Sequence, residues 1–146
     1  MFVVDTNVLI YAANTSCPEH ARCRERLTQW RLQALPWFLT WGVIYEFMRV
    51  TTHPRVFAQP LTPSESLSFI RAVTAAPALR ILTESEDHQR FVERLVEDVP
   101  QLSGNIWHDA HLVALMQEHG ITRVYTRDTG FHRFSGIDVL DPLAES

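Results

Sequence analysis

Residues 2–13 read Phe2-Val3-Val4-Asp5-Thr6-Asn7-Val8-Leu9-Ile10-Tyr11-Ala12-Ala13. The apolar run at 2–4 is typical of a short buried strand, and the apolar spacing that resumes at Val8 predicts a helix over Thr6–Ala13. A strand that passes directly into a helix indicates an α/β fold, in which ligands bind where the parallel strands end. Asp5 stands at this junction. It is also a favoured helix-capping residue, so its role depends on where the other acids fall.

The composition indicates a single domain over residues 1–146. The chain has 146 residues and is 46% hydrophobic, enough to bury a substantial core. No segment approaches membrane-spanning length, and the N-terminal apolar run carries Asp5 and Asn7 with no basic residue before it, which argues against a secretory signal. Cys17 and Cys23 match neither a CxxC redox pair nor a paired zinc motif. We therefore expect a soluble, cytoplasmic protein with no membrane partner.

The type of the charged residues is more informative than the net charge. All 13 basic residues are Arg, and 17 acids bring the formal net charge to −4. A negative total usually disfavours nucleic acid as a partner, but acids that bind cations no longer contribute to that repulsion. Arg suits phosphate well, although the base composition of the genome explains the absence of Lys equally well.

Alternating strand and helix patterns predict the rest of the fold. Short apolar runs predict further strands at 37–39, 79–82, 123–126 and 137–140, and helical patterns occupy 17–35, 41–52, 63–76, 84–98 and 106–119. Two capping boxes, Thr62-Pro63-Ser64-Glu65 and Thr83-Glu84-Ser85-Glu86, mark helix starts. The arginines of the second helix are expected to form a solvated face. This pattern predicts an α/β fold with a central, mainly parallel sheet of four to five short strands flanked by helices.

Three further acids lie at positions that are unusual for surface residues. Glu46 flanks the apolar stripe of its helix, although an ion pair with Arg49 explains it equally well. Asp109 lies in the apolar stripe of its own helix, near enough to the N-terminus for the helix dipole to favour an anion. Asp128 follows a strand, as Asp5 does. A buried carboxylate needs a cationic partner, so these positions require an explanation.

The four acids can meet at one edge of the sheet. In a parallel sheet with right-handed crossovers, strand ends and the following helix N-termini lie on the same side. Carboxylates packed together need compensation, and Mg²⁺, or Mn²⁺ in its place, takes oxygen ligands and keeps several waters. Such a site suits phosphodiester hydrolysis by a metal-activated water. His108 and His111 flank Asp109, but a zinc site would require a third nitrogen or sulfur ligand nearby.

Four segments, which together cover most of the chain, resemble PIN-domain ribonucleases of the VapC toxin type. They are VVDTNVLIYA (3–12), WGVIYEFMRVTTHPRVF (41–57), IWHDAHLVALMQEHG (106–120) and VYTRDTGFHRFSGIDVLDPL (124–143). The resemblance implies a PIN-like fold with a catalytic and metal-binding set formed by Asp5, Glu46, Asp109 and Asp128. It also implies that Thr6, Asn7 and Thr126 support this set. Some PIN proteins carry a further acid where this chain has Phe131, which bears on whether a second ion is held.

The resemblance further implies a Mg²⁺-dependent endoribonuclease that acts as the toxin of a type II toxin–antitoxin pair. Its expected partners are a cognate antitoxin lying across the helices near the groove, an RNA substrate and a second copy of the chain in a homodimer. Arg49 and Arg127 are candidate phosphate contacts, although solvated surface positions also explain them.

Two alternatives stay open at this point. A phosphotransferase of the haloacid-dehalogenase type would use Asp5 as the nucleophile, but it would need an acid where the chain has Asn7. A catalytically inactive PIN-like binding module would be marked by the loss of a metal-site acid, whereas all four acids are present.

Overall fold

A computed structural model describes residues 1–145, and Ser146, the last residue of the expected domain, lies outside that range. Its centre is one five-stranded sheet in the order β3-β2-β1-β4-β5, with every neighbouring pair parallel. The strands are β1 (Val3–Val4), β2 (Trp37–Thr40), β3 (Leu79–Leu82), β4 (Arg123–Tyr125) and β5 (Asp138–Leu140). The predicted α/β class is confirmed, and so is the parallel sheet.

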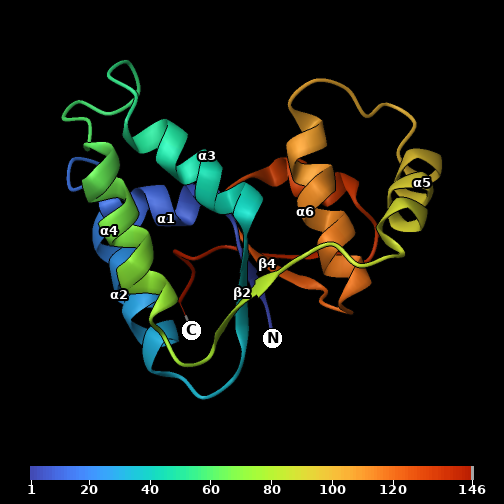
Figure 1. The fold of residues 1–146 in the computed structure, drawn as a ribbon, viewed down its shortest axis with the longest axis horizontal. Coiled ribbons are helices and arrows are strands. Elements are labelled where there is room, and N and C mark those ends of the chain that lie inside the picture. Colours follow the sequence, from blue (N-terminus) through green and yellow to red (C-terminus); the bar gives the residue numbers. More distant parts are fainter. Residues whose placement is uncertain (146) are drawn as a thin grey trace.

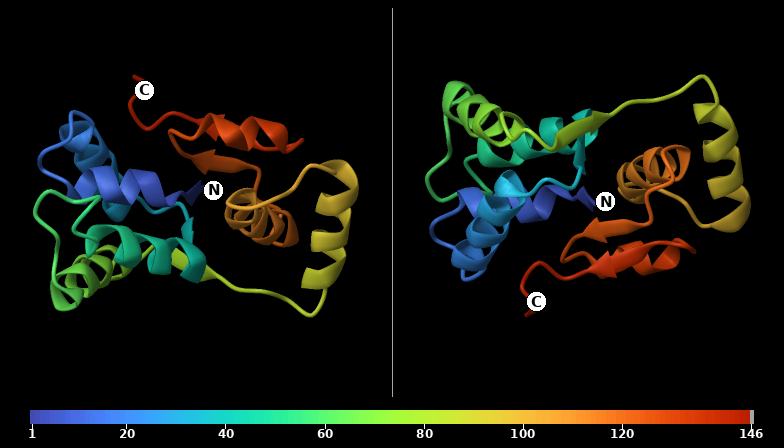
Figure 2. Two further views of the ribbon diagram at one scale, coloured as in Figure 1. Left: turned by 90° about the horizontal axis from the view of Figure 1, so that it is seen from above. Right: turned by 90° about the horizontal axis from the view of Figure 1, so that it is seen from below.

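Helices cover both faces of this sheet (Figures 1 and 2). One side carries α1 (Thr6–Ala13), α2 (His20–Leu32), α3 (Trp41–Thr51) and α4 (Pro63–Thr74), and the other carries α5 (His88–Asp98) and α6 (Ile106–Glu118). A short 3₁₀ helix, η1 (Thr129–Arg133), lies between β4 and β5. Within residues 1–145, no helix has the length and apolar character that crossing a membrane requires.

The register of β1 brings two distant parts of the chain to one edge of the sheet. Val3 pairs with Val124, and Val4 pairs with Tyr125. The Asp5 amide continues the ladder by donating to the Tyr125 carbonyl oxygen at 3.0 Å. Both valines of β1 are fully buried, because the central strand is covered on both faces. The residues after β1 and β4 are therefore neighbours.

One of the two predicted capping boxes forms and the other does not. The Thr62 hydroxyl accepts from the Glu65 amide and the Glu65 carboxylate accepts from the Thr62 amide, so α4 begins as predicted. The helix expected from the second box was placed too early, because α5 begins only at His88. The side chains of Glu84 and Ser85 instead bond to residues of α6. Tertiary partners here prevail over a local pattern.

The second helix also differs from expectation. It runs His20–Leu32, so Cys17 lies before the helix rather than inside it. Its arginines do not all form a solvated face, because Arg26 is buried and donates from Nε to the Pro142 carbonyl oxygen at 3.2 Å. Arg26 also donates to the Ala144 carbonyl oxygen. This guanidinium ties α2 to the C-terminal segment.

Candidate active site

The four predicted acids line one cavity of about 760 Å³ at the strand-end side of the sheet. Asp5 follows β1, Glu46 comes from α3, Asp109 from the first turn of α6, and Asp128 from the segment after β4. Glu46 and Asp109 are half-buried, Asp5 is buried, and Asp128 is exposed. Residues separated by more than one hundred positions thus share one surface.

Asp5 is 6% exposed, and its carboxylate accepts hydrogen bonds from the start of α1 and from the residue after β4. Its Oδ1 accepts from the Thr6 amide at 2.7 Å, which makes it the N-cap of α1 as well as a cavity residue. Its Oδ2 accepts from Asn7 Nδ2 at 2.9 Å and from the Thr126 hydroxyl at 2.7 Å. These bonds fix the carboxylate in one orientation.

The Thr126 hydroxyl connects the two strand ends. While it donates to Asp5, it accepts from Asn7 Nδ2 at 2.9 Å and from the Asp128 amide at 2.9 Å. Asn7 adds a further link, because its Oδ1 accepts from the Arg127 amide at 3.2 Å. Thr126 is 2% exposed, so its hydroxyl group is shielded from water, and its bond to Asp5 is buried. Two of the three expected supporting residues, Asn7 and Thr126, therefore contact Asp5 by their side chains.

The cavity disfavours negative charge on two of its acids. Burial raises the pKa of Asp5, and hydrogen bonds from Thr126 and the Thr6 amide only partly oppose this effect. Burial, followed by the charges of Asp5 and Asp128, raises the pKa of Asp109 to about 6. Such a cluster gains stability from a bound cation, because a cation removes the repulsion among the carboxylates.

Glu46 differs from the other acids, because it already has a cationic partner. The guanidinium of Arg49, one turn along α3, donates to both carboxylate oxygens, with Nε at 2.9 Å from Oε2. This hydrogen bonding lowers the pKa of Glu46 despite its partial burial. The ion pair that the sequence allowed is present, and both residues also line the cavity.

The structure separates the two predicted phosphate-binding arginines. Arg49 lines the cavity of the acids, whereas Arg127 lines a different pocket and its guanidinium lies 3.4 Å from the Asp141 carboxylate. Arg133 and His108, which were not among the predicted site residues, line the cavity instead. Arg133 is held by a 2.8 Å bond from its Nε to the Gly130 carbonyl oxygen, and only the turn of η1 brings it there.

The donor set of the cavity fits a hard divalent cation. Carboxylate oxygens are the ligands that Mg²⁺ and Mn²⁺ prefer. The Thr6 hydroxyl is buried beside them and has no hydrogen-bond partner within residues 1–145, so it can still bond to a ligand or a water. In the same range, no three of the four acids bring oxygen atoms within 4.8 Å of one another. An ion that keeps several waters suits this spacing.

Phe131, where some PIN proteins have a further acid, is part of the core. It is fully buried and lies 6.2 Å from Phe134, centroid to centroid. Phe131→Asp should lower the free energy of unfolding by at least about 3 kcal/mol, because it removes a buried aromatic ring and buries a carboxylate. Urea unfolding would measure this. Thr129→Asp, at an exposed position of the same 3₁₀ helix, is the control, and an equally small effect of both changes would contradict the core assignment.

Comparison with known families supplies independent evidence. The sequence model of the PIN domain matches residues 2–137. Ribonuclease VapC48 of Mycobacterium tuberculosis is 33% identical over 140 residues, which are 96% of this chain and 96% of that protein. Ribonuclease VapC43 of the same organism is 36% identical over 143 residues, covering 98% of this chain and 96% of its own.

Solved structures show the same fold at lower identity. A crystal structure of Mycobacterium tuberculosis VapC20, described as a sarcin-ricin loop cleaving toxin, superposes with a TM-score of 0.63 at 17% identity over 90% of this chain and 93% of that one. The crystal structure of Rickettsia felis VapBC2 bound to a DNA fragment from its promoter has a TM-score of 0.63 at 15% identity. The match covers 95% of this chain and 96% of that one.

Proposed function

The chain belongs to the PIN domain family, and on that premise we propose that it is a metal-dependent endoribonuclease, the toxin of a toxin–antitoxin pair. Its relatives at 33–36% identity are named ribonucleases, and they match it over nearly their whole length. We propose the cytoplasm as its place of action, because cellular RNA and an antitoxin are its proposed partners.

One observation supports the proposal that the protein uses metal ions to cleave RNA. Asp5, Glu46, Asp109 and Asp128 face one cavity, and the pKa of Asp5 and of Asp109 is raised there. A surface cluster of acids would repel the phosphates of RNA, so these carboxylates serve a nuclease only if they hold cations. We propose Mg²⁺ as the physiological ion, with Mn²⁺ able to replace it.

Each residue then has a defined task. Asp5, Asp109 and Asp128 would hold the ion, and Glu46 would complete the acidic wall while its charge stays balanced by Arg49. When bound, the ion would lower the pKa of a coordinated water and offset negative charge on the reacting phosphate. The guanidinium groups of Arg49 and Arg133, at the wall of the same cavity, are suited to hold phosphate oxygens in place.

A protein partner is supported by exposed aromatic side chains on α3. Trp41 and Tyr45 are 55% and 69% exposed, and their rings lie 6.1 Å apart. Large exposed apolar groups of this kind commonly mark interaction sites. We propose that a cognate antitoxin covers this face beside the cavity, and that the free toxin is a homodimer. Solved relatives include toxin–antitoxin complexes, such as the one from Klebsiella pneumoniae.

The direct test is cleavage of total cellular RNA by the purified protein. Cleavage should require Mg²⁺ or Mn²⁺, stop on addition of EDTA, and stop again when the antitoxin encoded beside the toxin is added. Sequencing of the new RNA ends would identify the substrate. Intact RNA in the presence of metal, from a protein that still binds Mn²⁺, would favour the inactive binding module instead.

Replacement of Thr126 tests whether its hydroxyl group orients the Asp5 carboxylate. Thr126→Val keeps the shape of the side chain but removes the hydroxyl that bonds to Asp5, Asn7 and the Asp128 amide. It should weaken Mg²⁺ affinity or cleavage by about 10–100-fold, the usual effect of losing a residue that orients a metal ligand. Half-maximal Mg²⁺ concentration for cleavage is the measurement. Thr126→Ser retains the hydroxyl and should stay close to wild type, whereas equal losses in both variants would refute this role.

The phosphotransferase alternative finds no support in the site. It would place an acid at position 7 to protonate the leaving group. Asn7 there is occupied as a donor to Asp5 and Thr126 and as an acceptor from the Arg127 amide. Trapping of an aspartyl-phosphate on Asp5 would be needed to revive it.

A further inference from the structure

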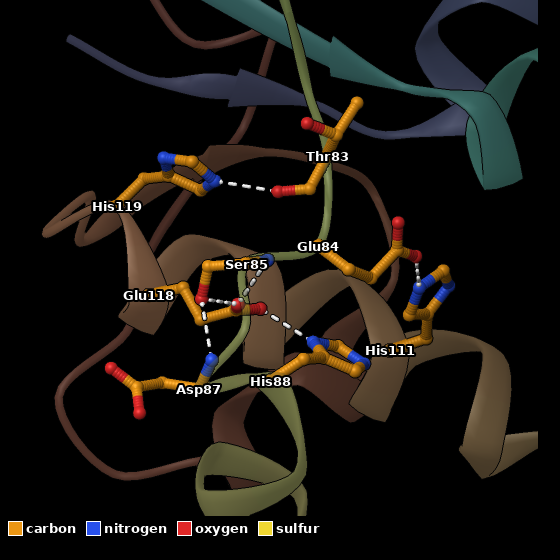
Figure 3. Close-up of polar contacts among 8 residues, drawn as sticks. All are labelled: Thr83, Glu84, Ser85, Asp87, His88, His111, Glu118 and His119. Atoms are coloured by element: carbon orange, nitrogen blue, oxygen red, sulfur yellow. Dashed lines mark hydrogen bonds and ion pairs between the residues drawn. The ribbon is translucent and has the colours of Figure 1, made fainter.

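A second group of candidate ligands lies away from the acidic cavity, in the segment between β3 and α6. The loop after β3 forms no side-chain cap on α5, and its Glu84 and Ser85 side chains bond to α6 instead. Glu84 from this loop, His88 from the first turn of α5 and His111 from the middle of α6 come together there (Figure 3). We call these three residues the Glu-His-His cluster.

The Glu-His-His cluster is compact enough to surround one ion. Each of its residues offers one ligand atom, and these atoms all lie within 4.8 Å of one another. His111 Nε2 is 2.7 Å from Glu84 Oε1, and the two imidazole rings meet edge to face with centroids 5.7 Å apart. In a tetrahedral zinc site with bonds of 2.0–2.2 Å, ligand atoms lie about 3.3 Å apart, so small side-chain rotations suffice.

A buried carboxylate already holds one of the histidines in position. The Glu118 side chain is 1% exposed, and its Oε2 pairs with His88 Nδ1. Its Oε1 accepts from the Ser85 amide at 2.9 Å and from the Ser85 hydroxyl at 2.6 Å (Figure 3). This pairing fixes the orientation of the His88 ring and leaves Nε2 as its nitrogen for a metal. Metal-binding histidines are commonly held by a carboxylate in this way.

We propose that Glu84, His88 and His111 bind a zinc ion or a similar transition-metal ion, with water completing the coordination. Two imidazole nitrogens and one carboxylate form a ligand set that Zn²⁺ takes with water as the fourth ligand, so the third nitrogen or sulfur ligand expected from the sequence is not required. Mg²⁺ prefers oxygen alone. The site is distinct from the acidic cavity, because His111 comes two residues after Asp109 and therefore points about 200° away around α6. It does not depend on the proposed function.

Such a site joins three segments of the chain, namely the loop after β3, α5 and α6. In both views of Figure 2, α5 is the outermost helix beside α6, at the end of a long connection from β3. An ion would bind the loop, α5 and α6 to one another. Because it binds only the folded protein, it stabilises that arrangement in proportion to its affinity.

The experiment measures Zn²⁺ and Co²⁺ binding by the full chain in excess Mg²⁺, which competes for sites that take oxygen ligands alone. Zn²⁺ affinity is measured by competition with a chromophoric chelator, and Co²⁺ reports its coordination through visible absorption. Wild-type protein should bind one Zn²⁺, give the absorption of four-coordinate Co²⁺, and unfold at a higher temperature with Zn²⁺. His88→Gln and His111→Gln should each weaken Zn²⁺ binding at least tenfold and remove the Co²⁺ absorption.

Two further variants keep the test decisive. His119→Gln changes a histidine of the same neighbourhood that pairs with the Thr83 carbonyl oxygen outside the cluster, and it should bind Zn²⁺ as the wild type does. Glu84→Gln changes an exposed ligand and should weaken binding even if a histidine variant does not fold. Absence of Co²⁺ absorption in the wild type would overturn the proposal. So would equal Zn²⁺ affinity in all variants, or an equal loss in His119→Gln.

Discussion

Asp5→Asn is expected to reduce RNA cleavage by about a thousandfold or more while the protein stays folded. A bound metal contributes several kcal/mol of charge stabilisation, and each 1.36 kcal/mol corresponds to a factor of ten in rate. Asn can still accept from the Thr6 amide, so the cap of α1 is kept. The amide nitrogen of Asn would replace the oxygen that accepts from Asn7 and Thr126, so the thermal midpoint of the variant is measured beside its activity. Single-turnover cleavage of a defined RNA would measure the activity.

Asp138→Asn is the matched control for this experiment. Asp138 is an exposed residue of β5 that lies outside the acidic cavity, and its replacement makes the same change in net charge. Cleavage by this variant should equal that of the wild type. If Asp5→Asn kept more than about a tenth of wild-type activity in Mg²⁺, the carboxylate site would not be the catalytic centre.

Asp109→Asn should change activity and stability in opposite directions. Cleavage should fall by about a thousandfold, as for Asp5, because a ligand is lost. In the metal-free protein, however, the variant should be more stable at pH 7 by about 1–2 kcal/mol. The pKa of Asp109 is raised to about 6, and each pKa unit corresponds to 1.36 kcal/mol, reduced here because the carboxyl group is partly exposed.

The pH dependence of the free energy of unfolding follows from the raised pKa of Asp109. Between pH 4 and pH 6 the folded protein holds a proton on Asp109 that the unfolded chain has released, so the free energy of unfolding falls as pH rises. Urea unfolding in EDTA should show this decrease in the wild type and a smaller one in Asp109→Asn. Mg²⁺ should raise the thermal midpoint of the wild type more than that of the variant. A metal-free variant less stable than the wild type at pH 7 would contradict the repulsion among these acids.

The sequence was sufficient for the elements with strong local signals. The helix Thr6–Ala13 and the capping box at Thr62 formed as predicted, because their hydrogen bonds lie within a few residues. The second box failed because Glu84 and Ser85 have better partners on α6, more than twenty residues away. No local sequence pattern predicts such a distant partner. Arg26 is buried for the same reason, through carbonyl oxygens at the other end of the chain.

The residues of the candidate site also fall into two groups: those that the sequence identifies and those that only the tertiary structure places there. The four acids could be named in advance, because each is unusual for its place in a strand or helix and because four spaced segments resemble one family. Arg133 and His108 could be noted in the sequence but not placed at the site, since only the turn of η1 and the direction of α6 bring them to the cavity. The pairing of Arg127 with Asp141, which turns one predicted phosphate contact toward a different pocket, depends likewise on β5.

By itself, the sequence determined the alternation of strands and helices and the four acids, because hydrophobic periodicity and residue chemistry act over short stretches of chain. Tertiary structure alone decided which side chains share a surface. Phe2-Val3-Val4 predicted a strand, but the register of β1 against β4 is what places the Thr126 hydroxyl on Asp5. The packing of α5 on α6 likewise brings His88 beside His111, although their separation of 23 residues along the chain carries no signal.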